Sequence, residues 1–180
     1  MLISGYRLKI WCLSLLTMQR ILFTGPRYLT DEQRQQVVST VTTKYLPESR
    51  GENCLWVLGD APGVDELLWE IARHQGCNYS RVIVNPNLIN NSDTRKWAYA
   101  ERSQRMVNLL SAGDIAVGFP NKPCPADCTP RSPWSGGGSG TWGTLAASKA
   151  VEGVEVFAYP IVDNVVLPNW LRYKQLSLFD

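Results

Sequence analysis

Short apolar runs alternate with helical patterns along this chain, and this alternation restricts its fold more than any other feature. The runs occupy residues 21–23, 55–58, 82–84, 115–119 and 154–158. Strands that are apolar throughout are typical of parallel sheets, which are buried on both faces. We therefore predict an α/β fold with a Rossmann-like parallel sheet of about five strands, helices on both faces and a single domain.

The segments between these runs carry helix signals. Thr30 can cap a first helix, and Gln33 can reach back to complete a capping box. A second helix is expected at residues 65–75, with Gly76 ending it. Longer patterns predict helices at residues 93–110 and 144–151, the latter stopped by Gly153.

Length and composition set the domain organisation. The chain has 180 residues, 44% of them hydrophobic, which suits one domain with a proper core. We assign this domain to residues 20–162, a leader or misassigned start to residues 1–19, where Met18 could be the initiator, and a tail to residues 163–180.

Charge and cysteine content limit the functional classes. A formal net charge of +2 provides no strong field for nucleic acid or for an anionic membrane. Five cysteines form an odd set in a chain without a convincing secretion signal. Reduced thiols and a cytoplasmic location are therefore expected.

Three loops should meet where ligands bind in parallel sheets, beyond the carboxyl ends of the strands. The first two are residues 24–27 and 59–65, and the third is the glycine stretch that follows residues 115–119. The candidate ligand-binding residues of the first two loops are Gly25, Arg27, Gly59, Asp60 and Gly63. Arg27 could pair with an anion, and Asp60 or Asp65 could accept hydroxyl groups. Alternatively, glycine and proline only make turns here, and Asp65 only supports the start of a helix.

The glycine stretch at residues 135–144 favours a phosphate site. Glycine can take positive φ, so backbone N–H groups can surround an anion at the start of the following helix. The predicted phosphate-binding residues are Gly137, Gly138, Ser139, Gly140 and Thr141.

The glycine stretch also has other possible interpretations. It formally matches the dinucleotide pattern G-x-G-x-x-G, with Asp163 at the ribose position, but no strand directly precedes it. A P-loop is excluded because no Gly-Lys-Ser/Thr sequence follows the glycines. A flexible linker is the remaining structural alternative.

Arg102 lies on an otherwise apolar helical stripe, together with Ala98, Tyr99, Met106 and Leu109. A guanidinium on a buried face requires an acceptor. That acceptor could be the phosphate or carboxylate of a ligand, which we favour, or an internal carboxylate or carbonyl group.

Together these segments resemble the SLOG superfamily, which includes the DprA/Smf proteins, the LOG enzymes and the small YpsA-like proteins. The resemblance covers residues 20–160 and rests on residues 24–27 and 59–65, on Arg102 followed by Met106, and on residues 114–119 and 137–141. It is closest to the small YpsA-like members. It implies a Rossmann-like domain that binds a nucleotide or a nucleotide derivative, and by analogy a homodimer.

The LOG enzymes hydrolyse the N-glycosidic bond of nucleotides, so the resemblance to them implies this activity for the chain. They use an arginine matched by Arg102 and a glutamate at the position of Thr144. Threonine cannot act as a carboxylate, so catalysis would need Glu101, Asp60 or Asp65. Arg102 and Asp65 are the candidate catalytic residues, and a non-catalytic nucleotide sensor or DNA-metabolism adaptor is the alternative.

Residues 120–135 form a Pro-rich segment that is long for a strand-to-helix loop, so it could cover the phosphate site. Trp134 could stack on a base. Cys124 and Cys128 suggest zinc, but one pair is insufficient, because Cys54 and Cys77 should be core residues. We expect neither a metal nor a cofactor.

The end of the chain carries a possible docking motif. Residues 175–179 read Gln-Leu-Ser-Leu-Phe, which resembles the segment by which bacterial replication and repair proteins bind the sliding clamp. The contact residues would be Gln175, Leu176, Leu178 and Phe179. Alternatively, this tail simply packs its apolar residues on the domain.

Overall fold

The computed structural model describes residues 18–49, 52–90, 94–135 and 140–172, and it contains a five-stranded parallel sheet with the order β3-β2-β1-β4-β5. The strands are β1 (Gln19–Thr24), β2 (Cys54–Leu58), β3 (Asn78–Arg81), β4 (Ile115–Gly118) and β5 (Glu155–Ala158). All four neighbouring pairs are parallel. The prediction of a Rossmann-like α/β fold is confirmed.

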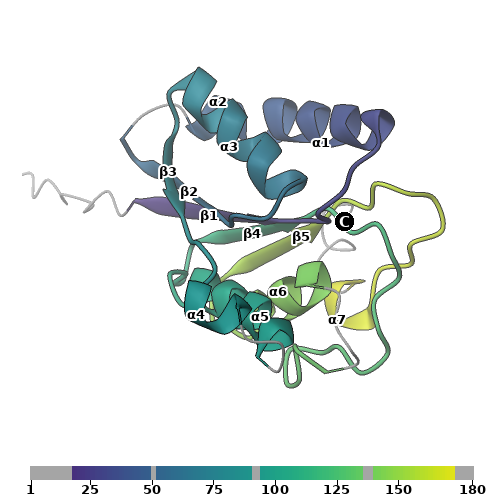
Figure 1. Cartoon of the computed structure of the whole chain (residues 1–180). Helices are drawn as coiled ribbons and strands as arrows, with labels where there is room; N and C mark the ends of the chain where they lie inside the picture. The colour runs from purple at the N-terminus through teal and green to yellow at the C-terminus, as the bar shows by residue number, and fades with distance from the viewer. Residues whose placement is uncertain (1–17, 50–51, 91–93, 136–139, 173–180) are drawn as a thin grey trace, which may run out of the picture.

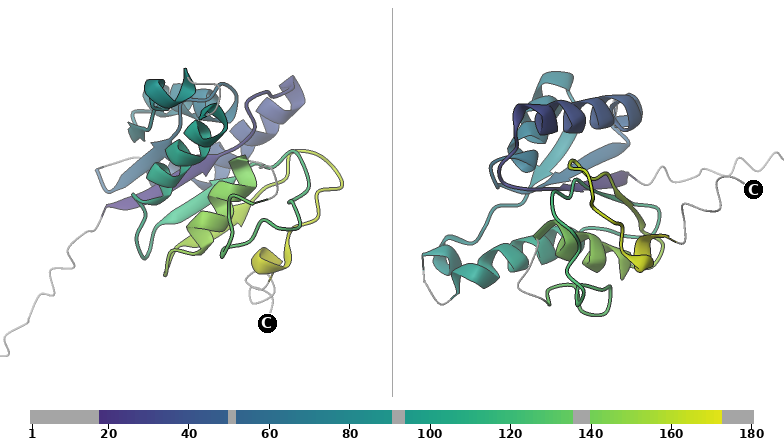
Figure 2. Two further views of the ribbon diagram at one scale, coloured as in Figure 1. Left: turned by 60° about the horizontal axis from the view of Figure 1, so that its bottom comes forward. Right: turned by 90° about the vertical axis from the view of Figure 1, so that its right-hand side faces the viewer.

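Helices cover both faces of the sheet (Figure 1). On one face lie α1 (Asp31–Lys44), α2 (Leu46–Ser49) and α3 (Val64–Gln75). On the other lie α4 (Pro86–Ile89), α5 (Arg95–Val107), α6 (Gly140–Lys149) and α7 (Asn169–Arg172). Figure 2 shows that α4 and the start of α5 project beyond the sheet. None of the helices formed by the described residues is long and apolar enough to cross a bilayer.

The central strand β1 divides two hydrophobic cores. Its residue Leu22 pairs in register with Val57 and Ala116, and these three side chains are buried against α5 and α6. Its neighbours Ile21 and Phe23 point to the opposite core, against α1 and α3. The alternation follows from strand geometry, in which successive side chains point to opposite faces.

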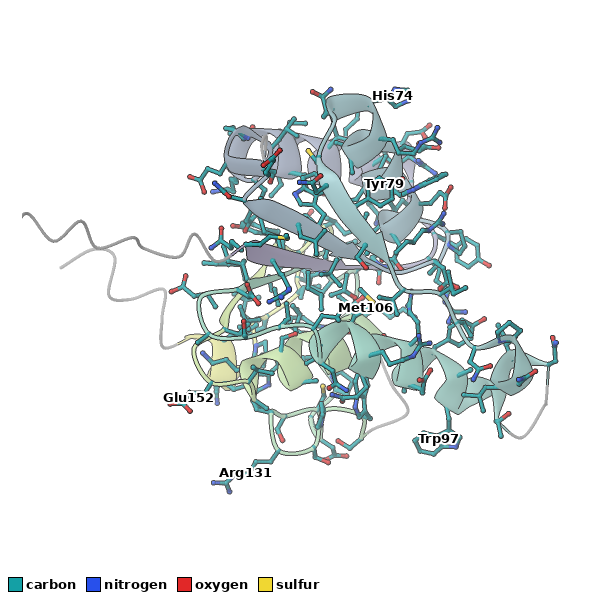
Figure 3. The ribbon with its side chains drawn as sticks, turned by 90° about the vertical axis from the view of Figure 1, so that its left-hand side faces the viewer. His74, Tyr79, Trp97, Met106, Arg131 and Glu152 are labelled. Atoms are coloured by element: carbon teal, nitrogen blue, oxygen red, sulfur yellow. The ribbon has the colours of Figure 1, made fainter. Side chains whose placement is uncertain are left out.

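Large aromatic residues fill each core. On the α1 side, Phe23 meets Trp56 edge to face, and the indole N–H of Trp56 donates to the buried hydroxyl of Ser49 at 2.8 Å. On the α5 side, Trp142 and Met106 are buried, and Figure 3 shows Met106 turned toward the sheet. α7 also adds the buried Leu171 to this second core, within the segment that we assigned to the tail.

The sequence signals for helix ends agree with the structure. Thr30 caps α1, and Gln33 completes the capping box. Gly76 ends α3 with φ at 69°, in the left-handed region. Such signals are local, so they survive without knowledge of the tertiary contacts.

The third strand was predicted wrongly. It comprises Asn78–Arg81 rather than residues 82–84, and Ile83 is 59% exposed. The Val82 N–H donates to the Leu58 carbonyl at 2.8 Å, after which the pairing with β2 ends. An edge strand is less buried than an interior one, so the polar sequence of β3 gave no apolar signal.

Helix boundaries also moved. α6 begins at Gly140 rather than at Thr144, so part of the predicted glycine loop forms its first turn. α5 ends at Val107 rather than at Leu110, and the predicted start at Asp93 lies outside the described residues. Leu110 packs in the core although it is not helical, which explains the overextension.

The capping box makes a prediction about stability. The Thr30 hydroxyl accepts the Gln33 N–H at 3.3 Å, so Thr30→Ala should lower the free energy of unfolding by about 1 kcal/mol. Thr30→Ser keeps an acceptor and should stay close to wild type. Urea denaturation of the three proteins measures this, and equal stability of the alanine variant would contradict the role of the cap.

Candidate ligand site at the carboxyl edge of the sheet

The direction in which the chain leaves the sheet reverses between β1 and β4. After β1 the chain passes to α1 on one face, whereas after β4 it returns through α6 on the other face. The Phe119 N–H donates to the Thr24 carbonyl at 3.0 Å and keeps the two strand ends together. Ligands of open α/β sheets bind at such a switch point.

The loops after β1 and β2 pack tightly on each other. A Cβ atom at Gly25 would lie 2.3 Å from the Val64 side chain. Gly63 has φ at 90°, and a Cβ there would lie 2.4 Å from the Pro26 carbonyl oxygen. These two predicted ligand residues are therefore required by loop packing. Any contact with a ligand would be additional to that role.

Arg27 is exposed at this edge and lies over an aromatic ring. Its guanidinium carbon is 3.5 Å from the centre of the Tyr99 ring of α5. None of the described carboxylates forms an ion pair with Arg27. The stacking holds the cation in place while its charge remains available. The sequence pattern places Tyr99 on the same helical stripe as Arg102, but it does not identify Tyr99 as the stacking partner of Arg27.

Arg102 is buried in α5 between two aspartates. Its Nη1 atom lies 2.8 Å from Oδ2 of Asp65 and 3.2 Å from Oδ1 of Asp60. Oδ2 of Asp65 also accepts the Ala61 N–H at 3.3 Å, and Oδ2 of Asp60 accepts the Val84 N–H at 2.7 Å. The acceptors of this buried-face arginine are thus internal carboxylates, the alternative that we had not favoured.

Gly59 leaves room for this ion cluster. A Cβ atom there would lie only 1.8 Å from Nη1 of Arg102 and 2.2 Å from Oδ2 of Asp65. The absence of a side chain at Gly59 therefore leaves room for the Arg102 guanidinium. Any side chain at this position would separate the ion pairs.

The charge state of Asp65 reflects two opposing effects. Burial raises the pKa of this carboxyl group above its usual value, and the neighbouring Arg102 opposes the rise. Arg102 is 8% exposed and Asp65 is 5% exposed, whereas the Asp60 side chain is 24% exposed. Asp60 is therefore the member of the cluster that a ligand could reach most easily.

The start of α6 is the third part of the site. Gly140 is exposed, and within the described part of the chain no atom would lie within 4 Å of a Cβ at this position, whereas Thr141 is buried. Thr144 is fully buried and donates its hydroxyl to the Gly140 carbonyl at 2.7 Å. The predicted cradle residues Gly137, Gly138 and Ser139 lie outside the described residues.

The Pro-rich segment 120–135 packs against this start of α6. The indole N–H of Trp134 donates to Gln104 Oε1 at 3.1 Å, and a Cβ at Gly143 would lie 2.6 Å from the Trp134 ring. Trp134 also lines a cavity of about 230 Å³ with Trp97 and Glu101, on the face of α5 opposite to Arg102. Figure 3 shows Trp97 pointing away from the sheet.

A hollow, a cysteine pair and the predicted docking motif complete the set of candidate sites. A larger hollow of about 590 Å³ is lined by one face of α1 and by residues 158–161, and the sequence did not suggest it. Cys124 and Cys128 are neighbours, but across the described ranges no group of three or more metal-binding side chains forms. The four predicted clamp-docking residues, Gln175, Leu176, Leu178 and Phe179, lie outside the part of the chain that the structure describes.

Comparison with known proteins supports the fold. Neither a protein-family model nor a curated protein sequence matches the chain. Among solved structures, the fold is similar to the X-ray structure of DNA processing protein A (DprA) from Streptococcus pneumoniae, with a TM-score of 0.56 and 16% sequence identity. The match covers 90% of this chain and 57% of that chain. This likeness establishes a DprA-like Rossmann fold and leaves activity and partners to be argued from the site.

The buried ion cluster gives a second stability prediction. Arg102→Met leaves Asp65 buried without its cation, so we expect a loss of about 3–5 kcal/mol in the free energy of unfolding at neutral pH. Without Arg102 the pKa of Asp65 rises further in the folded state only, so folding takes up a proton. The loss should therefore shrink as the pH falls toward the usual aspartate pKa.

The double variant Arg102→Met with Asp65→Asn provides the control. It removes the unpaired charge, so it should be more stable than Arg102→Met at neutral pH and less sensitive to pH. Chemical denaturation at several pH values measures both effects. A loss for Arg102→Met that does not change with pH would contradict the assigned pairing.

Proposed function

We propose that this protein binds a nucleotide or a nucleotide derivative at the carboxyl edge of its sheet, as a SLOG-type binding protein. The observation that carries the proposal is topological: the exposed Arg27 follows β1 and α6 follows β4, the two strands that flank the switch point. The DprA-like fold supports the class of site, and the glycine stretch supports a phosphate group as its anchor.

The electrostatics at this edge favour an anion. The first N–H groups of a helix point toward its start, and the helix dipole adds positive potential there, so the start of α6 attracts an anion. Arg27 supplies a full positive charge that Tyr99 keeps in place. A phosphate would bind the backbone N–H groups at the start of α6, and Arg27 would neutralise its remaining charge.

Binding is better supported than hydrolysis. The charge of Arg102 is already compensated by Asp65 and Asp60, and the Thr144 hydroxyl is bonded to the backbone of its own helix. Hydrolysis of an N-glycosidic bond requires a carboxyl group beside the sugar. Asp60 is the most exposed carboxylate of the cluster, so it is the first residue to test if turnover is found.

A second candidate function rests on the sequence at residues 175–179. Gln-Leu-Ser-Leu-Phe has the pattern of a short linear motif with two apolar anchors, which fits docking on the bacterial sliding clamp. Such docking would make the protein an adaptor of DNA metabolism whose nucleotide site acts as a sensor. Cytoplasmic location, a homodimer and closeness to YpsA-like proteins stay predictions.

The nucleotide site is tested by thermal and chemical denaturation with a panel of nucleoside mono-, di- and triphosphates. A ligand at a hundred times its dissociation constant should stabilise wild type by about 2.7 kcal/mol. Gly140→Asp should lose this gain, because it places a negative charge beside the phosphate. A side chain fits at Gly140 without a clash, so the variant should fold.

The matched control is Gly140→Asn, which has nearly the same size but no charge. It should retain most of the stabilisation, and Arg27→Gln should lose part of it. Equal stabilisation of the aspartate and asparagine variants would contradict a phosphate at the start of α6. Release of free base during incubation would add hydrolysis to the function.

The clamp prediction is independent of the nucleotide site. A labelled peptide of residues 171–180 should bind purified sliding clamp saturably in fluorescence polarisation, and Phe179→Ala should abolish the binding because it removes an apolar anchor. Ser177→Ala is the control, because that residue is not one of the predicted contacts. No saturable binding, or unchanged binding of the Phe179→Ala peptide, would exclude this docking.

A further inference from the structure

Cys124 and Cys128 face each other across a tight turn in the segment that precedes α6. The Cys128 N–H donates to the Pro125 carbonyl at 3.0 Å and closes this turn. The Cys124 thiol donates to the Cys128 carbonyl oxygen at 3.8 Å across the same turn. The turn therefore keeps the two cysteines close together.

The two thiols differ in access and in acidity. Cys124 is half-buried, whereas Cys128 is only 3% exposed. Burial raises the pKa of both thiols, and that of Cys128 rises to about 12. Cys124 is thus the thiol that an oxidant meets first, and Cys128 is placed to react second.

The thiol of Cys128 also fastens the next part of the segment. It donates to the Pro133 carbonyl at 3.3 Å. This carbonyl oxygen and the Trp134 ring lie directly against Gly143 of α6, at 3.0 and 2.6 Å from the position of a Cβ atom. A disulfide at Cys128 would remove its S–H donor. It would therefore remove one attachment of the residues that cover the start of α6.

We propose that Cys124 and Cys128 form a peroxide-responsive dithiol that closes to an intrachain disulfide and thereby loosens residues 133–134 from α6. The Cys124 thiolate attacks one oxygen of hydrogen peroxide, the O–O bond breaks, and the departing hydroxide takes up a proton to become water. The Cys128 sulfur then attacks the Cys124 sulfenic acid, the S–O bond breaks, and a second water leaves. Both thiols lose their hydrogens, and the Cys128 donor to Pro133 is lost.

The other cysteines provide internal controls. Cys54 and Cys77 are each 5% exposed in the opposite core, on the α1 side of the sheet. Cys12 lies outside the described residues and is replaced by serine in every protein tested. Cys124 and Cys128 fall in one tryptic peptide between Arg105 and Arg131, because a proline follows Lys122 and blocks cleavage there.

The experiment treats the full chain carrying Cys12→Ser with hydrogen peroxide in the presence of dimedone, and maps the tryptic peptides by mass. We expect the peptide of residues 106–131 to lose the mass of two hydrogens, and dithiothreitol to restore it. Cys128→Ser should instead carry dimedone on Cys124, because no second thiol resolves the sulfenic acid. The Cys77→Ser control should still form the disulfide.

A separate readout tests the loosening of residues 133–134. Oxidation should shift the tryptophan emission of the Cys12→Ser protein to longer wavelength, and Trp134→Phe in that background should remove the shift. An unmodified peptide after treatment, a dimedone adduct that persists on Cys124 although Cys128 is present, or a disulfide to Cys54 or Cys77 would overturn the proposal. A disulfide without the emission shift would overturn its second half.

Discussion

The buried pairing of Arg102 with Asp65 and Asp60 is the interaction on which the carboxyl edge of this protein depends. It joins α5 to the loop after β2 and to the first turn of α3, which are distant in sequence. Arg102 is 8% exposed, so its guanidinium loses most of its hydration and both carboxylates are needed to hold it. Gly59 is tied to this requirement, because any side chain there would collide with Nη1 of Arg102.

This pairing divides the predicted site into a scaffold and an open part. Close packing explains why glycine is present at three of the predicted ligand positions, Gly25, Gly59 and Gly63, without a role in ligand binding. Arg27 and the start of α6 are what the fold leaves exposed at the switch point. An exposed cation and the positive end of a helix dipole, together with a buried arginine that is already paired, suit the binding of an anion better than acid–base chemistry.

The sequence predicted local and periodic features well. The apolar runs located four of the five strands, and Thr30 and Gly76 marked helix ends through contacts of a few residues. It failed where neighbours in space decide the outcome. β3 is polar because it lies at the edge of the sheet. The partners of Arg102 come from the loop after β2 and from the first turn of α3, about forty residues earlier. Periodicity alone could therefore not choose between a ligand and an internal carboxylate as the acceptor. The closeness of Cys124 and Cys128 was visible as spacing, but its link to Pro133 and α6 was not.

NMR shifts of the backbone amides test directly whether an anionic ligand binds between Arg27 and the start of α6. Isotope-labelled protein would be titrated with the nucleotide that stabilises it most, and the backbone amide shifts would be mapped on the sheet. We expect the largest shifts at Gly25, Arg27, Gly140 and Thr141. Shifts confined to residues 32–40 and 158–161, around the larger hollow beside α1, would contradict it and move the ligand to the other face.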